Sequence, residues 1–201
     1  MVERYGFRTL KIKGGRQGID ADVDALHQLR SARGDQIRFY VDANGAYAPA
    51  VALDYVHAMA DAGAEVVEDP CALAPDAFFA RLQQSSKTPV LVDFYCGSPR
   101  DMQLFIAAGA RAFSLKPGRF GLSDTRTMSE LANAAGCQTV VGMFGESALG
   151  TLAALQLSSI LPPRSLPAET TWFLAMTEQI THEPLKIKDG AIQLPNVAGL
   201  S

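Results

Sequence analysis

The sequence lacks several features that would assign it to a broad class of protein. No apolar run approaches the ~20 residues of a membrane-spanning helix, and no basic stripe suggests a nucleic-acid partner. The formal net charge is −3 at pH 7, and the N-terminus shows no series of basic, apolar and small residues typical of a signal peptide. We therefore expect a cytoplasmic protein that binds neither membrane nor nucleic acid.

Cysteine and histidine are also scarce, with three of each among 201 residues. Cys71, Cys96 and Cys137 have no paired spacing and no histidine at metal-ligand spacing, which favours reduced thiols over disulfides or a zinc site. Hydrophobic residues make up 48% of the chain, enough for one substantial core. We expect residues 1–201 to form a single domain.

Short apolar runs that end in a charged residue recur along the chain. One leads to Asp42, and similar runs end at Lys13, Glu68, Asp93 and Lys116. Their spacing is close to the roughly 30 residues of one βα unit in a (β/α)8 barrel. Because ligands bind at the carboxyl ends of parallel strands, five charges in step predict a shared site. For one strand alone, such as that before Asp42, an acid that caps its own turn is the alternative.

The segments between these runs have apolar residues at helical spacing and glycine near their ends. We expect helices at 20–32, 49–62, 76–85, 99–108, 123–135 and 148–159, strands at 139–143 and 166–172, and a hairpin at 185–194 around Asp189-Gly190. This order predicts an α/β fold of about seven strands, a TIM-barrel-like (β/α)7β barrel that lacks its first strand. An open sheet of six or seven strands is the alternative.

Six short motifs follow one another along nearly the whole chain. They are LKIKGG at 10–15, VDANG at 41–45, VEDP at 67–70, VD at 92–93, LKPGR at 115–119 and GESALG at 145–150. Together they resemble the enolase superfamily, in its mandelate racemase/muconate lactonizing enzyme branch. The resemblance implies a barrel that carries a magnesium ion, and an N-terminal capping domain that closes over its mouth. The capping domain and the first barrel strand have no counterpart in this sequence.

The resemblance also implies a metal site. Asp42, Glu68 and Asp93 match the family's three metal ligands. Three hard oxygen ligands suit Mg²⁺, with Mn²⁺ as an alternative ion, and leave positions for water and a substrate carboxylate. The alternative is a set of salt bridges among these acids and the neighbouring lysines.

The same resemblance assigns the lysines. Lys13 and Lys116 match an acid/base pair, one on each face of the substrate, and Lys11 is the auxiliary member of the Lys-x-Lys pair. Two residues apart on a strand, Lys11 and Lys13 point to the same face. A pair of solvated lysines at a strand edge is the alternative. No histidine occurs within 139–147, so the Asp-His dyad of mandelate racemase-like members is absent and the lysine pair resembles the muconate lactonizing subgroup.

Four further residues are expected near the substrate. Asn44 belongs to the VDANG motif, and Glu146 matches an acid near the substrate carboxylate, with a cap for the following helix as its alternative. Glu169 and Trp172, near the end of the last expected strand, would favour an ammonium-bearing substrate such as an amino-acid derivative. The alternative for this pair is a core tryptophan and a surface glutamate.

The implied reaction is Mg²⁺-dependent abstraction of a proton α to a carboxylate through an enediolate. Racemase or epimerase, cycloisomerase and dehydratase types are all compatible with it. Because the capping domain and first strand are absent, three alternatives stay open: a truncated barrel without turnover, a barrel completed by a chain that carries the capping domain, and a non-catalytic α/β module that binds a small anion. As partners we expect a small carboxylate substrate and either a second copy, in a homo-oligomer, or the chain that carries the capping domain.

Overall fold

A computed structural model describes residues 1–162 and 166–194 of the chain. They form two compact units, Arg8–Phe113 and Met1–Phe7 with Ser114–Ser201. The single domain expected over 1–201 stays a prediction, and residues 163–165 and 195–201 lie outside the described part.

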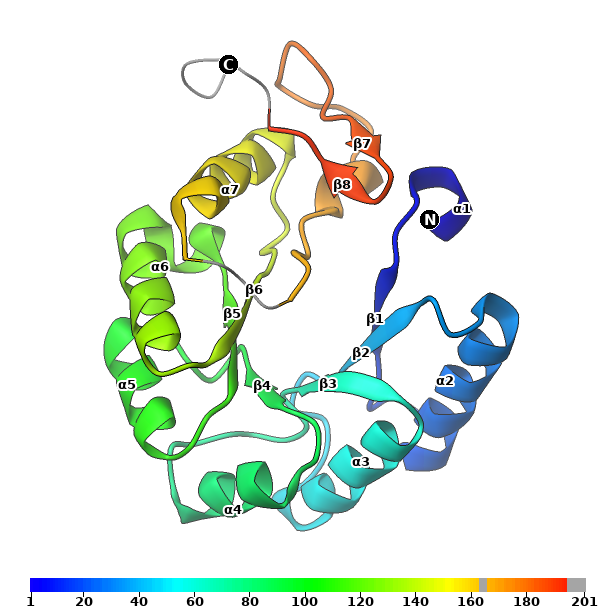
Figure 1. Cartoon of the computed structure of the whole chain (residues 1–201), viewed down its shortest axis with the longest axis vertical. Coiled ribbons are helices and arrows are strands. Elements are labelled where there is room, and N and C mark those ends of the chain that lie inside the picture. The colour runs from blue at the N-terminus through cyan, green and yellow to red at the C-terminus, as the bar shows by residue number, and fades with distance from the viewer. Residues whose placement is uncertain (163–165, 195–201) are drawn as a thin grey trace. The chain divides into compact units, whose positions relative to one another are not determined.

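The strands form a six-stranded sheet in chain order, β1-β2-β3-β4-β5-β6 (Figure 1). Their bounds are β1 Thr9–Lys13, β2 Arg38–Asp42, β3 Ala64–Glu68, β4 Val90–Val92, β5 Ala112–Leu115 and β6 Gln138–Val141. The four pairs from β1 to β5 are parallel. Each strand therefore lies beside the next strand in the sequence. This order is that of a (β/α)8 barrel, whereas the strand order of a doubly wound open sheet reverses.

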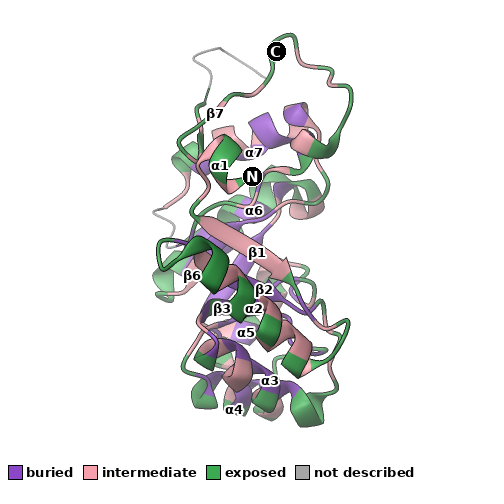
Figure 2. Cartoon of the chain, turned by 90° about the vertical axis from the view of Figure 1, so that its right-hand side faces the viewer, coloured by how far each residue is buried: buried purple, intermediate pink, exposed green. Residues whose placement is uncertain are grey.

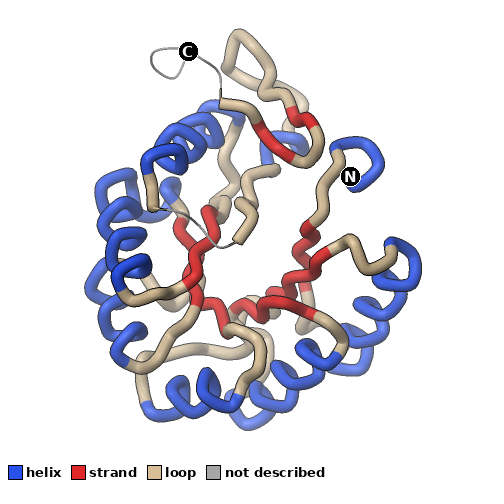
Figure 3. Tube along the Cα trace, viewed as in Figure 1, coloured by secondary structure: helices blue, strands red, loops and turns tan. Residues whose placement is uncertain are grey.

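The helices occupy the segments between the strands, as the apolar spacing predicts. Their bounds are α1 Val2–Tyr5, α2 Ile19–Arg33, α3 Pro49–Asp61, α4 Ala77–Ser85, α5 Pro99–Ala107, α6 Pro117–Ala134 and α7 Ala148–Ile160. In the unit Arg8–Phe113, helices α2 to α5 lie on one side of the strands (Figure 3). Side-chain caps mark the starts of α4 and α5, because Asp76 accepts from the Phe79 N–H (2.9 Å) and Ser98 from the Asp101 N–H (3.1 Å).

The core of the unit Arg8–Phe113 is the layer between these helices and the strands. The strand side chains of Phe39, Val41 and Val67 are fully buried. The side chains of Tyr55 and Met59 in α3 are also fully buried. Strand β1 is only partly buried, as its intermediate colouring shows (Figure 2). Strands β2 and β3 are buried more completely than β1, and they carry two of the predicted metal ligands.

One expectation for the other unit is confirmed and one is wrong. The helix expected at 123–135 is the part of α6 that follows a break at Gly121, where φ is 77°, and a further helical stretch from Pro117 precedes that break. The strand expected at 166–172 is absent, and a 3-10 helix occupies Trp172–Ala175. The Glu169 N–H donates to the Val141 carbonyl of β6 (2.8 Å), but residues 166–171 form no strand. Pro167 has no N–H to donate, which removes one rung of the ladder that the expected strand needs.

The hairpin prediction is confirmed. Strands β7 (Ile187–Lys188) and β8 (Ala191–Ile192) pair antiparallel. Asp189 (φ 51°) and Gly190 (φ 77°) both have left-handed backbones, as a type I′ turn requires. Of the three cysteines, Cys71 and Cys96 are buried and Cys137 is partly buried. Among the described residues, no helix is both long enough and apolar enough to cross a membrane.

Candidate functional site

Three predicted site residues stand in one row across adjacent strands. In the parallel register Lys13 of β1 is opposite Asp42 of β2, and Asp42 is opposite Glu68 of β3. Each of these residues is the last of its strand, so the row lies at the carboxyl end of the sheet. Lys11 precedes Lys13 by two residues, and its side chain points to the same face. The sequence prediction that these charges come together is correct for this row.

Two lysine ammonium groups hold the two carboxylates of the row. Lys11 Nζ lies 2.8 Å from Glu68 Oε2 and 3.2 Å from Asp42 Oδ2. Lys13 Nζ donates to Asp42 Oδ2 at 2.5 Å and to Asn44 Oδ1 at 3.1 Å. The Lys11 side chain is 12% exposed, whereas that of Lys13 is 50% exposed. Lys11 is therefore a mostly buried counter-ion, and Lys13 is the lysine that is more open to solvent or a ligand.

Asp42 also accepts hydrogen bonds from its own turn. The Asn44 backbone N–H donates to Asp42 Oδ1 (2.8 Å), and the Asn44 side-chain amide donates to Oδ2 (3.1 Å). Burial by itself would raise the pKa of Asp42, but the Lys11 charge, Lys13 and the Asn44 N–H together hold that pKa below its usual value. Asp42 thus caps its own turn and pairs with two lysines, while its role as a metal ligand stays a prediction.

The third predicted metal ligand, Asp93, follows β4 and is also buried, with 4% of its surface exposed. Within residues 1–162 and 166–194, no three His, Cys, Asp or Glu side chains gather at a spacing that would hold a metal ion. Asp42 and Glu68 do converge on one cation, the Lys11 ammonium. Their hard carboxylate oxygens at a shared cation position fit the chemistry of a Mg²⁺ site. A metal ion there would displace that ammonium or share the two carboxylates with it, and Asp93 would be the third ligand.

A polar network that the sequence prediction missed supports the loop after Lys13. Asp22 of α2 accepts from the Gly15 N–H (2.7 Å) and from the Tyr47 hydroxyl (3.1 Å). Burial, followed by the nearby Asp22 charge, raises the pKa of Tyr47 to about 12. A Cβ at Gly14 would lie 2.5 Å from the Tyr55 hydroxyl and 2.6 Å from Asp22 Oδ2, so this glycine lets the loop approach the network. The Gly-Gly pair at 14–15 was the one sequence signal for it.

Asp69 is the second residue that the prediction missed. Both oxygens of its buried carboxylate accept backbone N–H bonds, from Asp93 (3.1 Å) and Phe94 (2.8 Å). Burial raises the pKa of Asp69 to about 7; the two N–H bonds oppose this shift, and the charges of Asp93 and Asp42 add to it. Its position directly after Glu68 was visible in the sequence, but its contacts were not.

Lys116 and Glu146 belong to the other unit. Lys116 directly follows β5, and its side chain passes close to Gly142, where an added Cβ would lie 2.9 Å from Lys116 Cε. Glu146 Oε2 accepts from the Phe144 N–H (2.6 Å), and its Oε1 is buried without a hydrogen bond beside Gly118. The Ser147 side chain makes no cap bond, and the Ala148 N–H at the start of α7 donates to the Gln179 side chain (2.7 Å). Glu146 accepts from Phe144 instead, so its roles near the substrate and near the helix start stay predictions.

Glu169 and Trp172 also lie in that unit. Trp172 is 48% exposed, so the alternative of a core tryptophan is wrong. Its indole Nε1 would lie 3.8 Å from a Cβ added at Gly145, next to Glu146 in the sequence. The expected opposition of Lys13 and Lys116 stays a prediction, because these lysines belong to different units.

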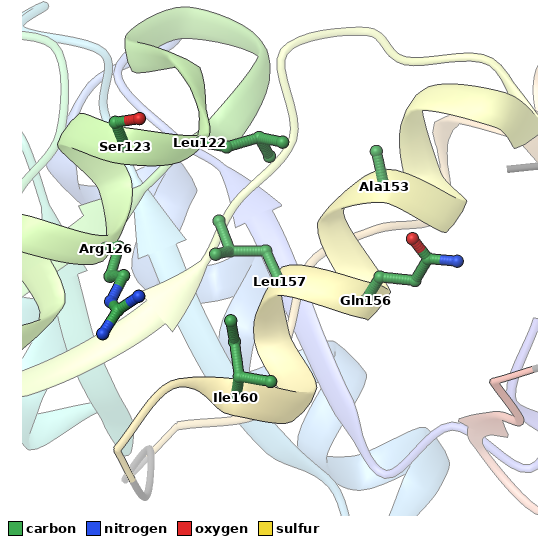
Figure 4. Close-up of a pocket in the computed structure, with 7 residues that line it drawn as sticks. All are labelled: Leu122, Ser123, Arg126, Ala153, Gln156, Leu157 and Ile160. Carbon is green, nitrogen blue, oxygen red and sulfur yellow. The ribbon is translucent and has the colours of Figure 1, made fainter. Parts of the chain in front are cut away.

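A surface groove of about 350 Å³ lies between α6 and α7 (Figure 4). Its lining consists of Leu122, Ser123, Arg126, Ala153, Gln156, Leu157 and Ile160. None of the predicted site residues lines this groove, so we do not assign the substrate to it.

Solved structures of muconate lactonizing enzymes match the whole chain. The enzyme from Pseudomonas putida has a TM-score of 0.94 at 26% identity, with 100% of this chain and 56% of that chain covered. Muconate cycloisomerase from Pseudomonas fluorescens also gives 0.94, at 29% identity and the same coverage. These matches confirm the predicted TIM-barrel-like α/β class.

Curated relatives give the same result at the level of sequence. Chloromuconate cycloisomerase from Cupriavidus pinatubonensis is 27% identical over 99% of this chain and 54% of its own length. Muconate cycloisomerase 1-2 from Acinetobacter lwoffii is 30% identical over 100% of this chain and 52% of its own length. This chain thus spans about half the length of the curated relatives it matches. The family model described as "Enolase C-terminal domain-like" matches residues 1–201, and the chain belongs to this family.

Proposed function

We propose that the chain is the barrel part of a divalent-metal-dependent enzyme that removes a proton α to a carboxylate. The observation that carries this proposal is the row Lys13–Asp42–Glu68, with Lys11 behind it, at the carboxyl end of three adjacent parallel strands. The similarity to proteins named muconate and chloromuconate cycloisomerases supports a cycloisomerase or a related isomerase or lyase of the same family.

The chemistry requires strong stabilisation of negative charge, because a proton α to a carboxylate is only weakly acidic. In this proposal Asp42, Glu68 and Asp93 hold Mg²⁺, or Mn²⁺ in its place. When bound, the ion would supply Lewis-acid stabilisation of the charge that develops on the substrate carboxylate. The carboxylates themselves are suited to the role because all three are buried at strand ends and at most 4% exposed.

The three lysines have different roles in this proposal. Lys13, which is half exposed and held by Asp42 and Asn44, is the group placed to exchange a proton with a bound substrate. Lys11, which is buried between Asp42 and Glu68, balances their charge. Lys116 is assigned as the second acid/base group on the strength of the family motif. Glu146, Glu169 and Trp172 are assigned to the substrate side, where the exposed indole and an acid would favour an ammonium-bearing carboxylate.

The test is exchange of the α-proton in D₂O with Mg²⁺, followed by ¹H NMR on a panel of small carboxylates that includes muconolactone and N-acyl amino acids. We expect exchange by the 201-residue chain that stops with EDTA and falls at least 100-fold in Lys13→Ala and Lys116→Ala. Lys87→Ala is the matched control, because Lys87 is 82% exposed and pairs only loosely with Asp61 at 3.4 Å.

Absence of exchange on every carboxylate would count against turnover by this chain. Mixing it with a chain that carries a capping domain would then restore exchange if the barrel is completed by a partner. If Mg²⁺ changes neither activity nor the midpoint of unfolding, the non-catalytic anion-binding module becomes the better description.

A further inference from the structure

Asp69 has a backbone conformation that a non-glycine residue rarely adopts. It follows Glu68 at the end of β3, its φ is 40°, and none of its surface is exposed. A left-handed backbone is strained for most L-residues, although aspartate tolerates it better than most. Such a conformation persists only where the surrounding contacts enforce it, so the contacts of Asp69 are the next question.

These contacts tie together the segments that follow three strands. The carboxylate accepts from the N–H groups of Asp93 (3.1 Å) and Phe94 (2.8 Å), after β4. The Asp69 N–H donates to the Leu91 carbonyl of β4 (3.1 Å), and the Asp69 carbonyl accepts from the Gly45 N–H, after β2 (2.7 Å). One buried residue therefore uses its main chain and both carboxylate oxygens to join the ends of β2, β3 and β4.

The three joined segments are those that carry the candidate metal ligands. Asp42 is three residues before Gly45, Glu68 is next to Asp69, and Asp93 is itself bonded through its N–H. The N–H groups of Asp93 and Phe94 lie where β4 has ended, and a buried N–H without a partner is costly. A carboxylate satisfies both, which fixes the direction in which the chain leaves β4.

We propose that Asp69 is a positioning residue, which sets the backbone of Asp93 relative to that of Glu68 so that both carboxylates can serve one metal ion. The part of this inference that concerns the metal rests on the proposed function. The part that concerns the backbone of Asp93 stands on the hydrogen bonds alone.

Two variants of Asp69 distinguish the effect of its carboxylate from the effect of its strained backbone. Asp69→Asn keeps the tolerance for a left-handed backbone but offers one acceptor oxygen in place of two. Asp69→Gly removes both acceptors and adopts the same φ without strain. Asp76→Gly is the matched control, because it removes a carboxylate that accepts one N–H bond, from Phe79 at 2.9 Å, in the same unit.

Hydrogen exchange by NMR and Mn²⁺ binding by EPR are the two readouts. We expect Asp69→Gly to speed exchange of the Asp93 and Phe94 amides at least tenfold, Asp69→Asn to speed one of them, and Asp76→Gly to speed neither. The Kd for Mn²⁺ should rise about 10- to 100-fold in Asp69→Gly, the usual effect of losing a residue that orients a metal ligand, and stay unchanged in Asp76→Gly.

The inference is overturned if both amides exchange in Asp69→Asn and Asp69→Gly as they do in the wild type. It is also overturned if Asp69→Gly frees the amides yet binds Mn²⁺ with the wild-type Kd. If the wild type itself binds no Mn²⁺, the proposed function fails, and exchange at Asp93 and Phe94 alone decides whether Asp69 positions this segment.

Discussion

The ammonium of Lys11 lies 2.8 Å from Glu68 Oε2, and the Lys11 side chain is only 12% exposed. The same nitrogen is 3.2 Å from Asp42 Oδ2. An ammonium group thus lies between two carboxylates that the proposed function assigns to a divalent cation. Binding of Mg²⁺ must move this ammonium or share the carboxylates with it, which makes Lys11 the residue that links metal affinity to stability.

Replacing Lys11 tests this link. Lys11→Met leaves Asp42 and Glu68 buried without their shared counter-ion, and removing one partner of a buried ion pair typically costs roughly 3–5 kcal/mol. We expect urea denaturation in EDTA to show a loss of this order. We also expect Mg²⁺ to raise the unfolding midpoint of Lys11→Met more than that of the wild type.

Lys87→Met is the control for this experiment. Its exposed pair with Asp61 should contribute only about 0–1 kcal/mol. Equal losses in the two variants, or no difference in their response to Mg²⁺, would contradict the assignment of Lys11 as a buried counter-ion.

The pKa of Asp69 predicts a pH dependence of stability in the metal-free protein. A carboxyl group whose pKa is raised in the folded state, here to about 7, stabilises the fold fully below its unfolded pKa and loses this contribution as pH rises through 7. Asp69→Asn lacks the group. The difference in unfolding free energy, wild type minus variant, should therefore fall between pH 4 and 7, by on the order of 1 kcal/mol per pH unit.

Urea denaturation in EDTA at several pH values measures this difference directly. Asp76→Asn, at the cap of α4, is a useful comparison because it replaces an acid that also accepts a backbone N–H bond. A wild-type minus Asp69→Asn difference that stays constant from pH 4 to 7 would show that Asp69 ionises as it does in the unfolded chain.

The close packing at Gly14 predicts that an added methyl group there lowers the free energy of unfolding through steric contacts and not through backbone strain. A Cβ there would lie 2.5 Å from the Tyr55 hydroxyl and 2.6 Å from Asp22 Oδ2, and its φ is not in the left-handed range. We expect Gly14→Ala to lower the unfolding free energy by about 1–3 kcal/mol, the usual cost of overpacking. At Gly97 the same Cβ would meet Asp101 at an ordinary 3.4 Å, so Gly97→Ala should change stability little. Equal effects of the two alanines would argue against a tight Asp22 network.

The contacts of Arg30 predict that it stabilises the fold of the same unit. Its guanidinium donates to the carbonyls of Ile37 (2.8 Å) and Gly63 (3.3 Å) and lies 4.7 Å from the centroid of the Phe39 ring. Arg30→Ala should cost roughly 1–3 kcal/mol, because two carbonyls lose a charged donor. Thermal and urea unfolding measure this loss. The exposed pair Arg126–Glu130 provides the control, since Arg126→Ala should be nearly neutral.

Much of the fold could be predicted because its signals are local. Apolar spacing located α2 to α5 and α7, and the Asp189-Gly190 pair located the hairpin, since each depends on neighbours along the chain. The alternation of strand and helix also predicted the TIM-barrel-like class. The strand expected at 166–172 failed because a strand requires a partner with matching donors and acceptors, and apolar residues alone do not reveal that partner.

The sequence by itself determined which residues end the strands, and the family motifs attached candidate roles to Lys13, Asp42, Glu68 and Asp93. Only the tertiary structure decided that Lys11 lies between two of these acids while Lys13 stays half exposed. It alone showed that Asp22 accepts a bond from the loop after β1 and that Asp69 accepts bonds from the segment after β4. The physical reason is that neighbouring parallel strands lie about 25 residues apart in the sequence. Their pairing therefore depends on contacts between distant segments, which local sequence signals do not specify. Their relative register, and therefore which charges meet, is fixed only when the helices between them bury their apolar faces.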